Sequence, residues 1–111
     1  MTVDTKKLFN EEIPGALTRR GDEARKIGGK YQLNIAGAGN WTIDLVSNPP
    51  TTVEGTATDA AVTIDVADAD FQTMVVDPSA GMKLFFAGKL KVKGNQMLAM
   101  NLQKLFALTR N

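Results

Sequence analysis

The spacing of the apolar residues changes period after the glycine pair at 28–29, and this change constrains the fold more than any other feature of the sequence. Before it, apolar residues recur every three or four positions, as they do in amphipathic helices. After it, the segments 30–35, 41–45 and 62–66 alternate apolar and polar residues, which predicts strands with one packed and one solvated face. A sheet with one apolar face needs a covering layer of helices, so we expect a two-layer α+β domain.

Capping residues and prolines locate the remaining elements. Helices are predicted at 3–28, 69–76, 78–87 and 95–110, with Asp4, Asp68, Asp77 and Asn95 as candidate N-caps. Pro14 is expected to break or restart the first helix. Further strands are predicted at 51–57, where the pattern is weaker, and at 89–93. The spacing of the first four strands suits an antiparallel meander, so the sheet is expected to be five-stranded and largely antiparallel, with helices on one face only.

The absence of cysteine and histidine from all 111 residues removes several kinds of chemistry. Without them there is no disulfide, no thiolate nucleophile and no histidine base or metal ligand. Four carboxylates lie close together in the sequence, at Asp59, Asp65, Asp68 and Asp70. We interpret Asp68 as a helix cap and Asp65 as part of the solvated sheet face. We therefore expect no enzyme activity, no metal and no cofactor.

The length of 111 residues predicts one domain over residues 1–111, and we expect it to be located in the cytoplasm. The net charge of +1 supplies no strong field for nucleic acid, which we do not expect as a partner. No apolar run is long enough to span a bilayer. The two ends match neither a secretory signal nor a peroxisomal address, and the expected cytoplasmic location is based on this.

The final predicted helix has two apolar arcs, whereas a helix lying on a sheet needs only one. The first arc contains Leu98, Leu102, Leu105 and Phe106, and the second contains Met97, Met100, Ala107 and Leu108. The second arc could pack against another helix, remain half exposed, or line an internal apolar cavity. Methionine is unbranched and polarizable, so it suits a wall that accepts several ligand shapes.

One segment also resembles a known family. Residues 85–105, FFAGKLKVKGNQMLAMNLQKL, are similar to the signature of the sterol carrier protein type 2 family, and KIGGKYQLNI and DAAVTIDVADADFQTMV resemble the same family upstream, in the same order. The resemblance implies a five-stranded, largely antiparallel sheet covered on one face by helices. It also implies a hydrophobic tunnel between the layers that binds sterols, fatty acids, fatty acyl-CoA or phospholipids without covalent chemistry.

Ten residues are predicted to line this tunnel: Phe71, Met74, Val75, Met82, Phe85, Phe86, Met97, Met100, Gln103 and Leu108. Tyr31 and Trp41, at inward strand positions, are assigned to the core. The function expected is binding and intracellular transfer of apolar lipids. The alternative is an accessory module that presents a lipid or isoprenoid-quinone intermediate to a partner enzyme, whose identity stays open. The lysines at 89, 91 and 93 are interpreted as a solvated edge or as a group that steers the domain to anionic headgroups during transient membrane contact.

Overall fold

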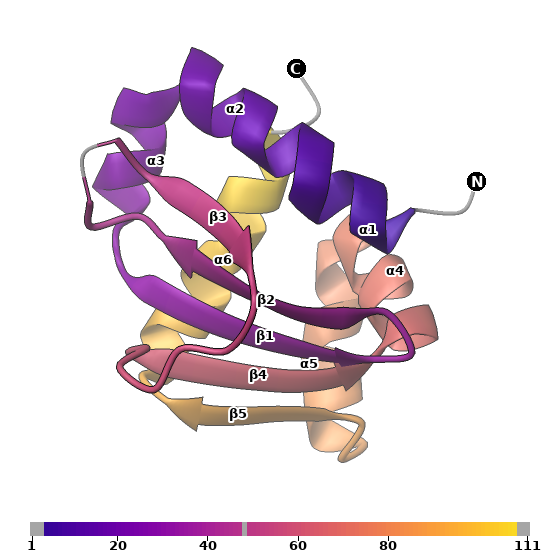
Figure 1. Ribbon diagram of the computed structural model, residues 1–111. Helices are drawn as coiled ribbons and strands as arrows, with labels where there is room; N and C mark the ends of the chain where they lie inside the picture. The colour runs from indigo at the N-terminus through magenta and orange to yellow at the C-terminus, as the bar shows by residue number, and fades with distance from the viewer. Residues whose placement is uncertain (1–3, 48, 109–111) are drawn as a thin grey trace.

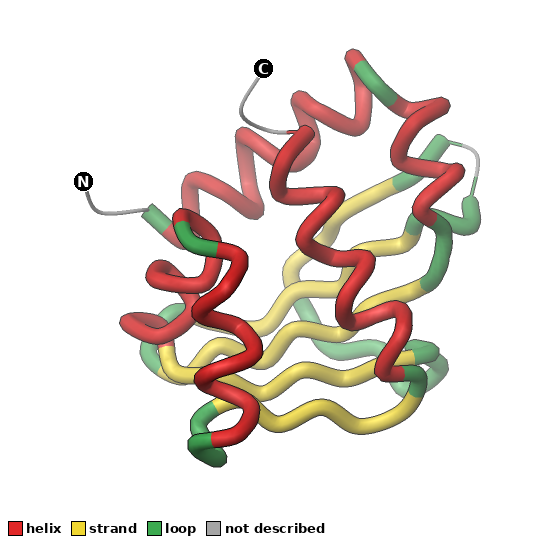
Figure 2. Tube along the Cα trace, turned by 180° about the vertical axis from the view of Figure 1, so that it is seen from behind, coloured by secondary structure: helices red, strands yellow, loops and turns green. Residues whose placement is uncertain are grey.

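Two layers make up the molecule, a sheet of five strands and a set of helices that cover one of its faces (Figures 1 and 2). The computed structural model describes residues 4–47 and 49–108. The strands are β1 (Lys30–Ala36), β2 (Gly39–Asp44), β3 (Thr51–Glu54), β4 (Val62–Ala67) and β5 (Leu90–Gly94). The helical segments are α1 (Thr5–Lys7), η1 (Leu8–Glu12), α2 (Ile13–Arg19), α3 (Gly21–Ile27), α4 (Asp68–Val76), α5 (Pro78–Phe86) and α6 (Gln96–Leu108). The predicted α+β class is confirmed.

The strand order β3-β2-β1-β4-β5 makes the sheet mixed. Strand β4 pairs in parallel with β1, with Leu33 opposite Ile64, and the other three pairings are antiparallel. The sheet is therefore largely antiparallel, as predicted, but the meander is wrong at β4. Alternation identifies the two faces of a strand and not its neighbours. Strand β4 buries three β-branched residues and lies inside the sheet, whereas β3, with Val53 56% exposed, forms an edge.

The predicted N-terminal helix is divided into shorter pieces, and residue 3, where that prediction begins, lies outside the described residues. The carboxylate of Asp4 caps α1 by accepting a backbone hydrogen bond at 3.1 Å. A π-helical turn, η1, precedes Pro14, and the backbone is helical on both sides of it, so Pro14 coincides with a change from π to α geometry rather than with a break. Arg20 departs from helical geometry between α2 and α3, and Gly28, at φ 70°, ends α3.

Two of the other three predicted caps are confirmed. Asp77 accepts a hydrogen bond of 3.1 Å from the first turn of α5, and Asn95 accepts two, of 3.0 and 3.3 Å, from the first turn of α6. Asp68 is not a cap, because Ala67 holds that position in α4. Its carboxylate instead accepts a hydrogen bond from the hydroxyl of Thr5, so it ties the start of α4 to α1.

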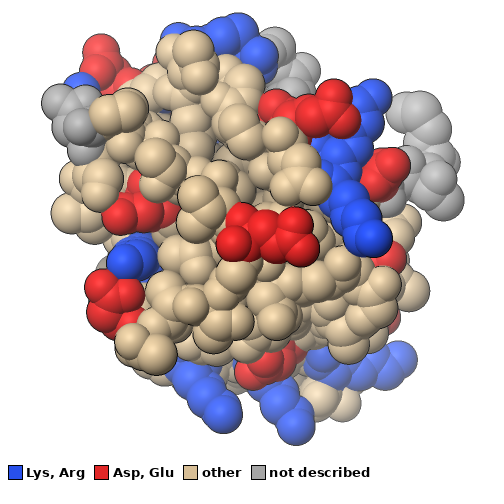
Figure 3. Space-filling model, viewed as in Figure 1, with Lys and Arg blue, Asp and Glu red and all other residues tan. Residues whose placement is uncertain are grey.

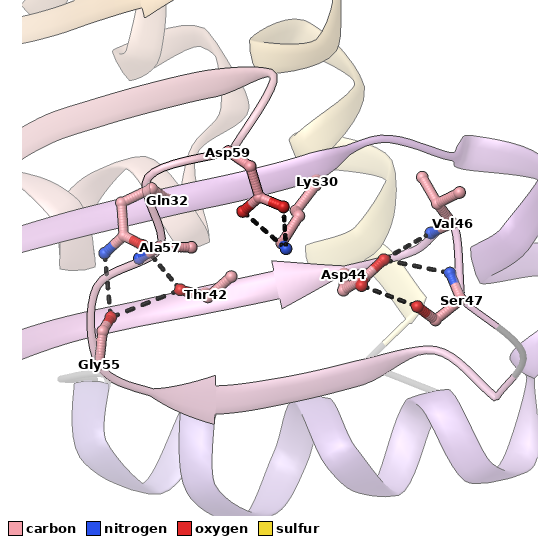
Figure 4. Close-up of polar contacts among 9 residues, drawn as sticks. All are labelled: Lys30, Gln32, Thr42, Asp44, Val46, Ser47, Gly55, Ala57 and Asp59. Atoms are coloured by element: carbon pink, nitrogen blue, oxygen red, sulfur yellow. Dashed lines mark hydrogen bonds and ion pairs between the residues drawn. The ribbon is translucent and has the colours of Figure 1, made fainter.

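A loop crosses the face of the sheet that the helices leave open (Figure 4). The side-chain nitrogen of Gln32 donates to the carbonyl of Gly55 at 3.1 Å, and its oxygen accepts from the hydroxyl of Thr42 at 2.6 Å and the backbone of Ala57 at 2.8 Å. Gln32 and Thr42 are consequently 1% and 6% exposed, although alternation predicted a solvated face. Their polar atoms are satisfied by this loop rather than by water.

The core lies between the two layers and is organised around stacked aromatic rings. Phe9 stacks on Trp41 with centroids 4.6 Å apart, and Phe71 lies 5.5 Å from both Phe9 and Phe106. Tyr31 is fully buried, and its hydroxyl donates to a backbone carbonyl after α3 at 2.7 Å. Burial raises the pKa of Tyr31 to about 12. The predicted core positions of Tyr31 and Trp41 are confirmed.

Candidate functional site

An apolar cavity of about 360 Å³ opens between α5, α6 and the β4–β5 side of the sheet. Its walls are Ile64, Met74, Gly81, Met82, Phe85, Leu90, Val92, Gln96, Ala99, Met100, Leu102 and Gln103. Helix α5 contacts α4 and β5, and α6 contacts α3, β4 and β5, so the two helices flank the cavity. The volume falls within the range of small-molecule sites, roughly 300–1,000 Å³.

Burial distinguishes a closed end of the cavity from an open mouth. At the closed end, Ile64, Met74 and Leu102 are 2%, 3% and 1% exposed. At the mouth, Met82 and Met100 are 58% and 67% exposed. A ligand that enters between the two exposed methionines therefore reaches a wall that water does not touch.

The ten residues predicted to line a tunnel fall into three groups. Five of them line the cavity: Met74, Met82, Phe85, Met100 and Gln103. Three are buried away from its walls: Phe71, Val75 and Leu108. Two are exposed beyond its walls: Phe86 at 80% and Met97 at 76%. The side chain of Ala107, from the second arc, and residues 109–110 of the predicted final helix lie outside the described part of the chain.

The orientation of α5 explains why its largest side chains lie at the rim. The helix turns its small residues Ala80 and Gly81 inward together with Leu84, so Phe85 and Phe86 are carried toward solvent. Their rings form an edge-to-face pair with centroids 5.9 Å apart. Side-chain size alone therefore predicts the wrong inward face for α5, because this helix lies over a cavity rather than over a packed core.

Sequence reasoning missed Gly81, which defines how much space the cavity has. A Cβ added there would lie 3.4 Å from the Cγ and Sδ of Met74 and 3.6 Å from the Nε2 of Gln103. Any longer side chain at this position would extend into the cavity. Glycine inside a helix costs about 1 kcal/mol relative to alanine, so its occurrence within the predicted 78–87 helix was a usable signal.

None of the described residues that line the cavity is charged or titratable. The candidate carboxylates lie elsewhere: Asp59 accepts hydrogen bonds of 2.8 and 2.9 Å from Lys30, and Asp65 accepts one of 3.0 Å from Asn34. The hydrogen bond with Lys30 lowers the pKa of Asp59. Within residues 4–47 and 49–108, no three acidic side chains gather as a metal site would need. None of the described helices has the length and hydropathy needed to cross a bilayer.

Comparison with known proteins assigns the chain to one family. The model of the SCP-2 sterol transfer family matches residues 11–107. The chain belongs to this family. Human sterol carrier protein 2 is 33% identical to this SCP-2 chain over an alignment of 104 positions, which covers 88% of the chain and 19% of the human protein. The chain thus spans about a fifth of the length of that relative. The family resemblance seen in residues 85–105 is confirmed.

Solved structures of SCP-2 proteins share the fold. Sterol carrier protein 2 from Yarrowia lipolytica, in its apo form, is similar with a TM-score of 0.78 and 25% identity, covering 98% of this chain and 96% of that one. Sterol carrier protein-2 from Aedes aegypti, in complex with the C16 fatty acid palmitate, is similar with a TM-score of 0.72 and 21% identity, covering 97% of this chain and 98% of the other.

Proposed function

We propose that this SCP-2 domain binds the apolar tail of a lipid in the cavity between α5 and α6 and carries it between membranes without covalent chemistry. The observation that carries the proposal is the apolar cavity of about 360 Å³, closed at one end by Ile64, Met74 and Leu102. Water gains no hydrogen bonds from such an apolar wall, and burying a hydrocarbon chain against it is favourable in free energy.

The size of the cavity favours a single acyl chain. If a methylene takes about the volume of a water molecule, roughly 30 Å³, then 360 Å³ holds about a dozen methylenes. A longer chain extends past Met82 and Met100, whose flexible side chains can fold over it. A rigid sterol nucleus needs the mouth to widen before it enters. We therefore expect fatty acids and fatty acyl groups to bind in preference to sterols and two-chain phospholipids.

The polar groups of the cavity suit a headgroup held at the mouth. Gln96 is exposed and Gln103 is half-buried, and their amides can donate and accept hydrogen bonds. No cation lies among the described lining residues. A carboxylate carried to the closed end would lose its hydration without gaining a counter-ion, which is costly. The ionised headgroup is therefore expected to remain near Gln96, with the tail directed toward Ile64.

The same lining supports a carrier role rather than an enzymatic one. Proton transfer requires a titratable group within hydrogen-bond reach of the substrate. The buried hydroxyl of Tyr31 points to a backbone carbonyl and is not part of the cavity wall. Incubation with acyl-CoA and cholesteryl esters should therefore release no free thiol or fatty acid, and measurable turnover would contradict this part of the proposal.

Titration with saturated fatty acids of increasing length tests the proposal directly. Burying the roughly 15 carbon groups of a C16 tail is worth about 12 kcal/mol at about 0.8 each. Association costs at least about 4 kcal/mol, which leaves a dissociation constant of about 1 μM at best. Affinity should rise steeply up to about 12 carbons and more slowly beyond. No saturable binding of any chain length, or of a sterol, would refute the proposal.

Two further expectations from the sequence remain predictions. Presentation of a lipid or quinone intermediate to a partner enzyme would require that enzyme to copurify with the chain, and affinity purification from the source organism tests this. The cytoplasmic location is tested by fractionating cells that express the chain with a fluorescent tag.

A further inference from the structure

The polar side chains inside the cavity differ in kind from those on the surface. On the face of the molecule seen in Figure 3, acidic and basic side chains are interspersed, and Lys30, for example, pairs with Asp59 at 2.8 Å. The described walls of the cavity instead carry two uncharged polar side chains, the amides of Gln96 and Gln103. Polar selection by this cavity must therefore depend on hydrogen bonds rather than on charge.

The two amides lie on one face of α6 at different depths. Residues 96 and 103 are two helical turns apart, which places them on the same side of the helix and about 10 Å apart along its axis. Gln96 is exposed in the first turn, whereas Gln103 is half-buried. The Nε2 of Gln103 and the Sδ of Met74 lie 3.6 and 3.4 Å from the point where a Cβ of residue 81 would be. The inner amide is therefore close to Met74, at the closed end.

The amide of Gln103 has no protein partner inside the cavity. Its side chain makes no hydrogen bond with any of the described residues. Because it is only half-buried, this amide can bond to water while the cavity holds no ligand. A plain hydrocarbon tail that fills the cavity displaces this water and leaves the amide unpaired, which costs free energy. A tail with an oxygen atom at the same depth restores the hydrogen bond.

We propose that the cavity selects fatty acyl chains that carry an uncharged oxygen, as a hydroxyl or a keto group, near the middle of the chain, and that Gln103 recognises this oxygen. The amide donates to either kind of oxygen and also accepts from a hydroxyl. The ionised headgroup stays in water beside Gln96. This inference rests on the proposed function, because it refines which acyl chain the cavity takes.

The depth of Gln103 determines where along the chain the oxygen belongs. An extended chain advances about 1.2 Å per bond, so the distance of about 10 Å between the two amides corresponds to about eight bonds. A carboxylate beside Gln96 then brings about carbon 9 to Gln103, and a headgroup further out in water shifts the match to about carbon 12. A hydroxyl at the end of the tail reaches Ile64 and Leu102, which offer it no hydrogen bond.

Palmitic acids with one hydroxyl at C8, C10, C12 or C16 test this recognition, because they share one composition and differ only in the position of the oxygen. Each competes with a fluorescent fatty acid for the cavity of the full chain. A hydrogen bond of this kind is worth about five- to ten-fold in binding, so the best mid-chain isomer should bind more tightly than the C16 isomer by that factor. Equal affinities of all four isomers would overturn the proposal.

Substitution of Gln103 separates recognition of the oxygen from the shape of the wall. Gln103→Leu removes the amide at similar volume, so the mid-chain isomers should lose their advantage over the C16 isomer. Palmitate itself should bind as well or several-fold more tightly, because no amide is left unpaired. Gln103→Met, unbranched like glutamine, should give the same result. An advantage that persists in both variants would overturn the proposal.

Gln96→Leu is the matched control, because it removes the other amide from the same face of α6. This change can weaken all four isomers, but the ratio between the best mid-chain isomer and the C16 isomer should stay the same. Loss of that ratio in Gln96→Leu and not in Gln103→Leu would assign recognition of the oxygen to the mouth and overturn the proposal.

Failure of this inference can be told apart from failure of the proposed function. A chain that binds palmitate but shows no preference among the four isomers lacks recognition by Gln103, and this inference alone is wrong. A chain that binds neither palmitate nor any of the isomers contradicts the proposed function instead.

Discussion

Gly81 offers a direct way to fill the cavity from its own wall. The position is buried in α5, and a side chain added there would lie against Met74 and Gln103 in the cavity wall. The distances of 3.4 and 3.6 Å are ordinary contacts, so Gly81→Ala fits without displacement. Gly81→Leu places three more carbon atoms in the cavity.

The magnitude follows from the volume. The four carbons of leucine take roughly 120 Å³ at about 30 Å³ each, a third of the cavity of about 360 Å³. About four ligand methylenes are excluded, which costs about 3 kcal/mol, or roughly a 200-fold loss of fatty-acid affinity. Gly81→Ala excludes about one methylene and should cost about four-fold. Both variants remove a helical glycine, so stability should rise, by about 1 kcal/mol for alanine.

The assay combines a fatty-acid titration with thermal melts of the three chains. Graded loss of affinity from glycine through alanine to leucine, with melting temperatures that do not fall, is the expected result. Unchanged affinity in a stable Gly81→Leu variant would show that the tail does not occupy this cavity. A large loss of stability in that variant would show that the space is already filled by relaxation of its walls.

Met100→Lys should weaken fatty-acid binding but lower the free energy of unfolding by less than about 1 kcal/mol, because Met100 is 67% exposed. Leu102→Lys buries an unpaired charge and should unfold the domain. Identical thermal melting curves for the two variants would assign both positions to the core. Gly94→Ala should lower the free energy of unfolding by about 2–4 kcal/mol, because φ at Gly94 is +99° and a Cβ there would collide with the carbonyl oxygen of Ala61. An unchanged midpoint of urea unfolding would contradict this. Tyr31 keeps its proton in the folded state up to about pH 12 but loses it near pH 10 when unfolded, so stability should fall as the pH rises through this range. In the Tyr31→Phe variant, stability should depend less on pH in this range. If the stabilities of the two chains fall in parallel as the pH rises, Tyr31 is not the cause.

Much of the fold could be predicted from the sequence because alternation and caps are local signals. The strand segments and the inward positions of Tyr31 and Trp41 follow from a period of two, which depends only on the geometry of one strand. The neighbour of β4 could not be predicted in this way. Its pairing with β1 depends on how the loop at 55–61 crosses the sheet, and the burial of Gln32 that this loop causes is equally non-local.

The site was predicted less completely, and α5 shows why. The rule that large apolar residues point inward applies to a packed core, so it selected Met82, Phe85 and Phe86 together. A helix that walls a cavity turns small residues inward, and only Met82 and Phe85 reach the wall, from its rim. Phe71, chosen for its size, is held in the aromatic core by Phe9.

The parallel pairing of β1 with β4 determines the order in which the molecule can assemble. Strands β1 and β2 are joined by a two-residue turn and can pair as soon as both exist, whereas β4 must first close a loop that spans β2 and β3. Every wall of the cavity lies at or after Ile64, so none is present when the first hairpin forms. The cavity can therefore bind a lipid only once β4, β5 and the helices α4 to α6 have come together, so a bound lipid stabilises that half of the folded domain against unfolding.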